Sequence, residues 1–398
     1  MGMSRLSEAL FISFLLSALT LGPLFRGGEE VGAAELPGAQ IRNHLKQGIG
    51  KVFDMDDKAG IAELMKAVEL DRESPTGYAF LTLAYLFFYE MSFDEKERER
   101  NQESMVHFVG EALSKGEKRV EKDPKDGQAF FAMGLAKLAK IRWNITRKRY
   151  FAVAQESQNI RDYLERAKDL DPENYDIYFP MGLLRYHLDH LPGFTRFLSS
   201  LLSTSGDRQK GLQELELAAK RGHLLKELAQ VELSSAYSNF EKQPGRALPL
   251  ARELKEKFPH NYNFLFSLAN TLSDLGRQEE ALSAAQEIEN GIKSGSPPFR
   301  PELWPRYYQL MGKINLDKKE YARATEFFKR AIQDASPYNA RVRAWALVRL
   351  GMIHDIHKER KLAEEYYRKA LDVEGGEGLA QIAAKQYLKS PYSHSPIK

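Results

Sequence analysis

Two pairs of histidines in the sequence have the spacing of metal ligands on a helix. His187 and His190 form the first pair, His354 and His357 the second, and each pair encloses one aspartate. Residues three apart lie on one face of an α-helix, so each pair could offer two imidazoles to a zinc or copper ion. No residue that could complete the ligand set follows nearby, and a zinc site needs at least three protein ligands. We therefore interpret the histidines as structural residues and predict no metal or other cofactor.

Motifs that would indicate catalysis do not occur in the sequence. It contains no Gly-rich phosphate loop, no His-Glu-x-x-His pair and no Gly-x-Ser-x-Gly elbow. It also contains no cysteine, which excludes disulfides, thiolate metal sites and a thiol-linked lipid anchor. We predict that the protein is not an enzyme.

A basic segment, Lys137–Arg149, carries six Lys and Arg residues without an acidic residue and includes Trp143. Such a segment could contact the phosphates of an anionic membrane surface. The interpretation we favour is a solvated face of a long helix, because charged runs are common on exposed helices. Over the whole chain, 58 Lys and Arg balance 55 Asp and Glu to a formal charge of +3, so nucleic acid is not an expected partner.

The first 34 residues have the order of a secretory signal peptide. Arg5 precedes a largely apolar run over residues 9–21, and a small-residue stretch that includes Ala33 and Ala34 follows. The run is shorter than a typical membrane-spanning helix, although an uncleaved N-terminal anchor stays open as an alternative. A leader together with the lack of cysteine predicts an exported protein, periplasmic or anchored facing the periplasm.

The elements that would position any site are antiparallel helical hairpins. Two units near the C-terminus share one pattern of small and large apolar residues, with Gly312 and Gly351 at equivalent places. In the first unit the pattern comprises Tyr308, Met311, Gly312, Ala324, Phe328 and Ala331; in the second it comprises Leu347, Leu350, Gly351, Ala363, Tyr367 and Ala370. A small residue in one helix and alanines in the next let the two helices pack closely.

This pattern resembles the tetratricopeptide repeat superfamily. The likeness extends upstream with longer units, and none of the units has tryptophan at the family's fourth position. It implies an all-α fold, a solenoid of about eight antiparallel hairpins over residues 41–374. A capping helix over 377–389 and a frayed tail over 390–398 should follow, although the residues do not show whether the long middle hairpins gain helices or only lengthen.

In members of this superfamily, fixed positions of each first helix line a concave groove. Mapped onto the middle units, these positions predict an aromatic, apolar and neutral-polar groove for a peptide or a helix. An equally weighted alternative is that these side chains form the core of a tightly wound superhelix. The predicted groove residues are Phe131, Leu135, Phe179, Leu183, Tyr186, His187, Val231, Ser235, Asn239, Phe266 and Asn270.

These observations favour a scaffold that binds a protein or peptide partner outside the cytoplasm. Preformed hairpins reduce the ordering entropy that is lost when a partner docks. The alternative, from another class, is a periplasmic carrier of a small ligand or lipid. In that case the insertions over residues 144–158 and 191–206 would close the superhelix into a pocket.

Overall fold

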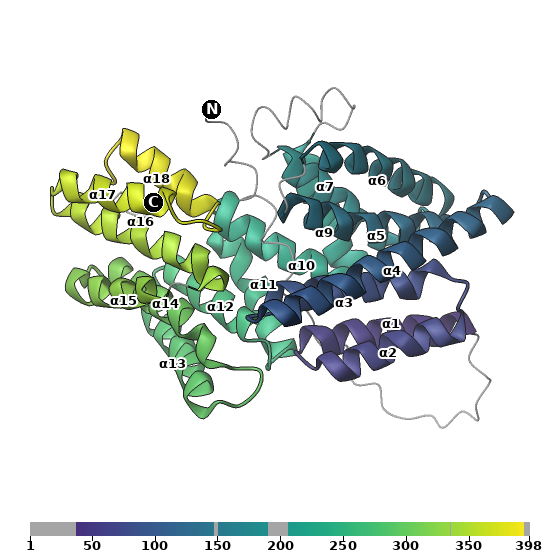
Figure 1. Cartoon of the computed structure of the whole chain (residues 1–398), viewed down its shortest axis with the longest axis horizontal. Coiled ribbons are helices and arrows are strands. Elements are labelled where there is room, and N and C mark those ends of the chain that lie inside the picture. The colour runs from purple at the N-terminus through teal and green to yellow at the C-terminus, as the bar shows by residue number, and fades with distance from the viewer. Residues whose placement is uncertain (1–36, 147–149, 190–205, 335, 394–398) are drawn as a thin grey trace. The chain divides into compact units, whose positions relative to one another are not determined.

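The computed structural model describes residues 37–146, 150–189, 206–334 and 336–393, and these residues form helices and turns without a β-strand (Figure 1). They divide into two compact units. The N-terminal unit contains residues 37–236 and 253–261, and the C-terminal unit contains residues 237–252 and 262–393. The fold class is an all-α, tetratricopeptide-like solenoid, as the sequence predicted. The leader predicted for residues 1–34 lies outside the described residues.

The N-terminal unit is a series of helical pairs. Each helix packs against the next along the chain, and the first helices of successive pairs also touch. The helices are α1 (Pro37–Phe53), α2 (Asp57–Leu70), α3 (Pro75–Met91), α4 (Glu95–Lys122), α5 (Gly127–Thr146), α6 (Tyr150–Leu170), α7 (Tyr178–Asp189), α9 (Arg208–Arg221) and α10 (Lys226–Ser235). The α3–α4 and α5–α6 hairpins are longer than a standard unit because their helices are lengthened: α4, α5 and α6 have 28, 20 and 21 residues.

Short polar side chains cap the start of several helices of this unit. Asp94 accepts a hydrogen bond from the Glu97 amide at 2.9 Å, and Asp207 accepts one from the Lys210 amide at 2.9 Å. Ser74 caps α3, which has Pro75 in its first turn. These side chains bond N–H groups that have no partner inside the helix, and proline fits there because it lacks an N–H.

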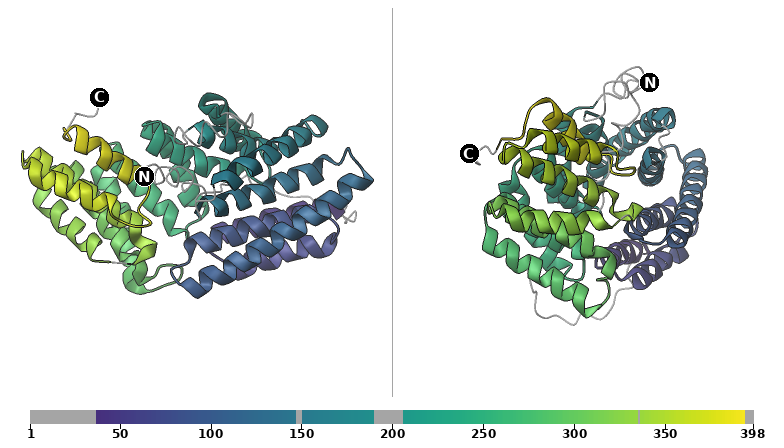
Figure 2. Two further views of the ribbon diagram at one scale, coloured as in Figure 1. Left: turned by 45° about the horizontal axis from the view of Figure 1, so that its top comes forward. Right: turned by 60° about the vertical axis from the view of Figure 1, so that its left-hand side comes forward.

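The C-terminal unit holds the repeats that are clearest in the sequence. A π-helical turn (Ala236–Phe240) leads to α11 (Pro244–Lys257), whose residues 244–252 belong to this unit. The following helices form three stacked pairs and a terminal helix, green to yellow in Figure 2. They are α12 (Tyr262–Asp274), α13 (Gln278–Ser294), α14 (Trp304–Asp317), α15 (Tyr321–Gln333), α16 (Ala340–Ile356), α17 (Arg360–Leu371) and α18 (Leu379–Lys389).

Close packing within the two C-terminal pairs depends on their glycines. A Cβ atom on Gly312 would lie 2.4 Å from the ring of Phe328, and one on Gly351 would lie 2.4 Å from the ring of Tyr367. Both rings are fully buried between the helices of their pairs. A larger residue at either glycine would therefore force the two helices apart.

The N-terminal unit is closed by a contact between residues about 200 positions apart. Asn261 donates a hydrogen bond to the carbonyl of Phe53 at 2.6 Å, and His260 bonds the carboxylate of Asp54 at 2.7 Å. The rings of Phe53 and Phe258 lie 6.0 Å apart. Repeats in an open array touch only their neighbours, so this contact joins the two ends of the unit. We call the residues 53, 54, 258, 260 and 261 the closure contact.

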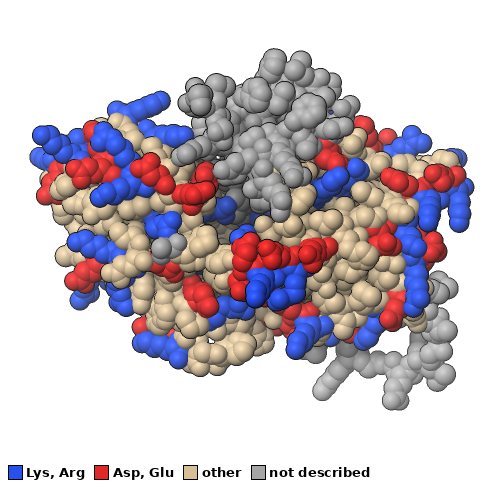
Figure 3. Space-filling model, in the orientation of Figure 1, with Lys and Arg blue, Asp and Glu red and all other residues tan. Residues whose placement is uncertain are grey.

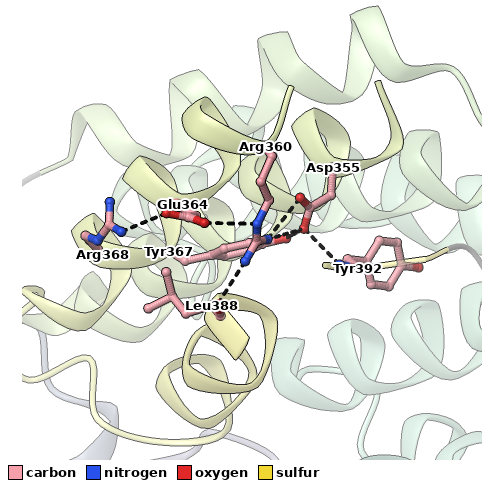
Figure 4. A network of polar contacts seen from close by, with 7 residues as sticks. All are labelled: Asp355, Arg360, Glu364, Tyr367, Arg368, Leu388 and Tyr392. Carbon is pink, nitrogen blue, oxygen red and sulfur yellow. Dashed lines mark hydrogen bonds and ion pairs between the residues drawn. The ribbon is translucent and has the colours of Figure 1, made fainter. Parts of the chain in front are cut away.

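The predicted capping helix is present as α18, which packs on α16 and α17. The chain stays attached beyond it, because the Tyr392 amide donates to the Asp355 carboxylate at 2.8 Å (Figure 4). Asp355 also accepts from the Tyr367 hydroxyl at 2.8 Å and pairs with Arg360 at 3.1 Å. The expectation of a frayed tail from residue 390 therefore does not hold at Tyr392, and residues 394–398 lie outside the described part.

Candidate functional site

The first helices of the C-terminal unit form its inner layer. Helices α12, α14, α16 and α18 contact one another in series, whereas α13, α15 and α17 pack chiefly against helices of this inner layer. In stacked-repeat proteins such an inner layer lines the concave side of the stack. Polar and charged side chains of α12, α14 and α16 lie along this side. Together with the ring of Phe266, on which Arg306 lies, we call them the inner strip: Asn263, Phe266, Asn270, Ser273, Asp274, Arg306, Lys313, Asp317 and Arg349.

At the centre of the inner strip, one lysine forms ion pairs with two carboxylates. Lys313 lies 2.8 Å from the carboxylate of Asp274 and 3.1 Å from that of Asp317. Its ammonium also approaches the carbonyl of Asn270 at 3.3 Å, and the Ser273 hydroxyl donates to Asp317 at 2.6 Å. The Lys313 side chain is 10% exposed, so these bonds connect α12 and α14 in a largely desolvated setting.

Two arginines of the inner strip differ from Lys313, because no carboxylate in the described residues lies within ion-pair distance of either one. Arg306 donates to the amide oxygen of Asn263 and lies 4.1 Å from the centre of the Phe266 ring. Burial lowers the pKa of Arg306 to about 10. Desolvation of the charged form is the cause.

Arg349 lies on the next inner helix, with its guanidinium 4.9 Å from the centre of the Trp345 ring. Burial lowers the pKa of Arg349, and the charges of Asp317 and Asp274 act against this shift. Its Nη1 atom is buried and has no hydrogen-bond partner among the residues that the structure describes. The inner strip thus holds two guanidinium groups that form no direct ion pair with a carboxylate of the described residues.

The predicted groove residues fall into two groups. Ser235 and Asn270 are half-buried and Asn239 is exposed, whereas the other eight are buried: Phe131, Leu135, Phe179, Leu183, Tyr186, His187, Val231 and Phe266. Only Phe266 and Asn270 lie on the inner strip. The inner positions of the middle hairpins are filled by core side chains, which matches the alternative that the sequence left open. A binding role for the set stays a prediction.

The histidines have partners other than metal. His187 and Glu232 are both 0% exposed, and the His187 Nε2 lies 2.5 Å from a Glu232 carboxylate oxygen. His354 contacts Glu359 at 2.6 Å and stacks on Tyr366 with a ring distance of 5.2 Å. Within the described ranges, no group of three or more His, Cys, Asp or Glu residues could hold a metal ion. His190 lies outside those ranges.

The basic segment Lys137–Arg149 is less exposed than expected for a solvated helix face. Lys137 and Lys140 pair with Glu156 at 2.9 and 2.6 Å, and Arg142 forms an ion pair with Glu90. The Lys137 and Arg142 side chains are 11% and 3% exposed. They form buried ion pairs that join α5 to its neighbours α6 and α3. The interpretation as a solvated face is wrong for these two residues. Residues 147–149 lie outside the described part, and membrane contact stays a prediction.

Charges of both signs cover the described residues of the face shown in Figure 3, where Lys and Arg are interspersed with Asp and Glu. No helix in the described part of the chain has the length and apolarity to cross a lipid bilayer. The insertions on which the carrier alternative depends lie partly outside the described residues, at 147–149 and 190–205.

Arg306, Lys313 and Arg349 were missed by the sequence-based mapping because it covered only the middle units. A usable signal was present. Gly312 and Gly351 fix the register of the last two units. The groove positions counted from Gly312 include Arg306, Lys313 and Asp317, whereas those counted from Gly351 do not include Arg349, which the pattern therefore could not identify.

Comparison with known proteins agrees with this architecture. The chain is a helical-repeat protein, and a model of the tetratricopeptide repeat family matches residues 305–333 and 346–375. The first segment contains nearly all of α14 and the whole of α15, and the second contains most of α16 and the whole of α17. These two segments are tetratricopeptide repeats, and proteins built from such repeats are generally protein-interaction scaffolds. No curated protein matches the sequence.

The solved structures that match this chain have low sequence identity and low TM-scores. A tetratricopeptide repeat protein from Parabacteroides merdae is 15% identical, with coverage of 82% of this chain and 99% of that one and a TM-score of 0.32. The human IFIT1 dimer with PPP-AAAA is 14% identical, with coverage of 89% and 84% and a TM-score of 0.44. Yeast Tom70 is 11% identical, with coverage of 88% and 96% and a TM-score of 0.28.

Proposed function

We propose that the protein is a non-catalytic scaffold that binds a protein or peptide partner on the inner strip of its C-terminal unit. The observation that carries this proposal is the contrast between the two inner surfaces. The predicted groove positions of the middle hairpins are mostly buried core, whereas the inner strip has half-buried polar groups such as Asn270, Arg306 and Arg349. Polar groups with unused hydrogen-bonding capacity can bond the backbone and side chains of a docked peptide.

Mixed charge supports a protein partner over nucleic acid. The chain has a formal charge of only +3, and the cations of the inner strip alternate with Asp274 and Asp317. Binding to nucleic acid relies on a continuous basic surface that releases many counterions.

Site-specific photocrosslinking tests the proposal. A photoreactive amino acid at Asn270 in the full chain, expressed in its own host, should capture a recurrent protein partner identified by mass spectrometry. The matched control places the same group at Lys329, an exposed residue on α15. Crosslinks that are equal at both positions, or absent at Asn270, would refute a partner site on the inner strip.

We also propose that the protein works outside the cytoplasm, in the periplasm or on a membrane facing it. The leader-like order of Arg5, the apolar run over 9–21 and Ala33–Ala34 supports this, together with the lack of cysteine. Cell fractionation followed by N-terminal sequencing tests it. A mature chain that begins near residue 34 or 35 is expected for cleavage, and an intact chain in the cytoplasmic fraction would contradict export.

A further inference from the structure

The segment after the last helix, residues 390–393, turns back onto the inner layer of the C-terminal unit. Helix α18 ends at Lys389 and packs on α16 as the last inner helix. Shortly after it, the Tyr392 amide donates to the Asp355 carboxylate on α16 at 2.8 Å (Figure 4). The Tyr392 ring meets the Tyr387 ring edge to face, with the ring centres 5.3 Å apart. We call residues 390–393 the return segment.

The return segment reaches the end of the inner strip. Asp317 and Asp355 lie in the last turns of α14 and α16, and these two helices contact each other in the inner layer. Burial raises the pKa of the Tyr392 hydroxyl to about 12, and the charges of Tyr387 and Asp317 act in the same direction. Tyr392 is therefore bonded to one inner helix and lies near the inner-strip carboxylate of the next.

Only one residue of the return segment is partly covered by the rest of the protein. Tyr392 is half-buried, whereas Pro391 and Ser393 on either side of it are exposed. Its acceptor, Asp355, has a side chain that is 1% exposed, and a hydrogen bond to an ionised acceptor is about twice as strong as one between neutral groups. The attachment is thus firm but local, and its release would leave the helices of the unit packed.

From this arrangement we propose that the return segment competes with the partner, because it occupies the end of the inner strip beside Asp317 and must leave before a peptide can dock there. The inference rests on the proposed function and adds its regulation. Two residues separate Tyr392 from the end of α18, so its effective concentration at this place is on the order of millimolar or higher. Molecules with the segment in place cannot bind, and the apparent affinity for the partner falls in proportion to the open fraction.

Peptide display with the full chain tests this inference. Random ten-residue peptides are selected on immobilised Tyr392→Pro, a variant that has neither the amide donor nor the ring of Tyr392. A photoreactive group at Asn270 identifies the enriched peptides that occupy the inner strip. These peptides are titrated by fluorescence anisotropy against the variant and the unaltered chain. We expect the variant to bind them about tenfold more tightly, because a hydrogen bond to a charged acceptor shifts an equilibrium by roughly this factor or more.

The matched control is Tyr392→Phe, which keeps the amide donor and the aromatic ring and should bind the peptides as weakly as the unaltered chain. A second measurement needs no variant. Amide hydrogen exchange at Tyr392 should be slow in the free, unaltered protein and should become faster when a selected peptide saturates it.

The outcomes separate competition from peptide binding. Peptides that crosslink at Asn270 but bind the unaltered chain as tightly as Tyr392→Pro, or that leave the Tyr392 amide protected, would overturn the competition and leave peptide binding in place. The return segment would then be a structural cap, and Tyr392→Pro would change only the unfolding temperature. Selection without any peptide that crosslinks at Asn270 would count against the inner strip as a peptide site and would overturn the competition with it.

Discussion

At the scale of single residues, the glycines of the clear repeats limit how close two helices can come. An alanine at Gly312 would place its Cβ 2.4 Å from the buried Phe328 ring. We expect Gly312→Ala to destabilise the protein by about 1–3 kcal/mol through overpacking, although alanine favours a helix by about 0.5–1 kcal/mol over glycine. Thermal unfolding measures this effect.

Gly110 on α4 supplies the control for this substitution. A Cβ there meets nothing within 4 Å, so Gly110→Ala should be neutral or stabilising by up to about 1 kcal/mol. Equal unfolding temperatures for the two variants would contradict the packing argument.

The carboxylate of Glu63 on α2 should make the free energy of unfolding depend on pH in the acidic range. Hydrogen bonds from His44 and Lys66 lower the pKa of Glu63 from 4.5 to about 2. Because the folded-state pKa is lowered, the stabilisation is present above about pH 4.5 and is lost as pH falls towards 2. Glu63→Gln should therefore lower the urea midpoint at pH 7 and have a smaller effect at pH 2 to 3. An equal effect at both pH values would show that this carboxylate does not cause the acid sensitivity.

At the scale of elements, one buried carboxylate attaches the chain that follows the C-terminal helix. The Asp355 side chain is 1% exposed and accepts bonds from α17 and from the chain after α18 (Figure 4). Asp355→Ala would leave the buried Tyr367 hydroxyl without its acceptor and remove one of the partners of Arg360, at a cost of about 1–3 kcal/mol. The rate of amide hydrogen exchange in α18 should be faster in Asp355→Ala than in the unaltered protein.

Glu364 tests whether any lost ion pair has this effect. It bonds Arg360 and Arg368 with a side chain that is 31% exposed, so Glu364→Gln should cost at most about 1 kcal/mol. If both variants leave α18 equally protected, Asp355 does not anchor the terminal helix.

The elements were predictable where the repeat pattern is regular. The alanines and glycines around Gly312 and Gly351 define both C-terminal pairs, because close helix packing admits few alternatives at those positions. The length of α4 was not predictable in the same way. A 28-residue helix and two shorter helices can bury similar apolar residues, and the choice depends on contacts with α3 and α5.

At the scale of the whole chain, the closure contact should couple segments that are far apart in sequence. Asn261→Ala removes the 2.6 Å bond to the Phe53 carbonyl, and an unsatisfied buried carbonyl costs about 1–3 kcal/mol. We expect faster amide exchange in α1 as well as around residue 261. Asn290→Ala, at an exposed position on α13, is the control and should leave α1 unchanged. Faster exchange confined to the neighbourhood of residue 261 would refute the coupling.

The same scale explains why the candidate site was only partly predictable. Repeat register identified Phe266 and Asn270 as inner residues, and it also assigned Phe179 and Tyr186 to a groove. Those two side chains are buried in the N-terminal unit, whose ends meet in the closure contact. Register determines which side of a helix faces inward. Whether that side is open depends on contacts over about 200 residues, which a local pattern does not encode.

The closure contact also sets an order of events during synthesis. Phe53 leaves the ribosome 208 residues before Asn261. At about 5–20 residues per second, the first hairpin waits roughly 10–40 s for the segment that covers it. During this interval the Phe53 ring is not yet covered by the Phe258 ring, which packs against it in the finished fold. The nascent chain should therefore depend on a chaperone at this stage, and a fragment that ends before residue 258 should aggregate more readily than the complete protein.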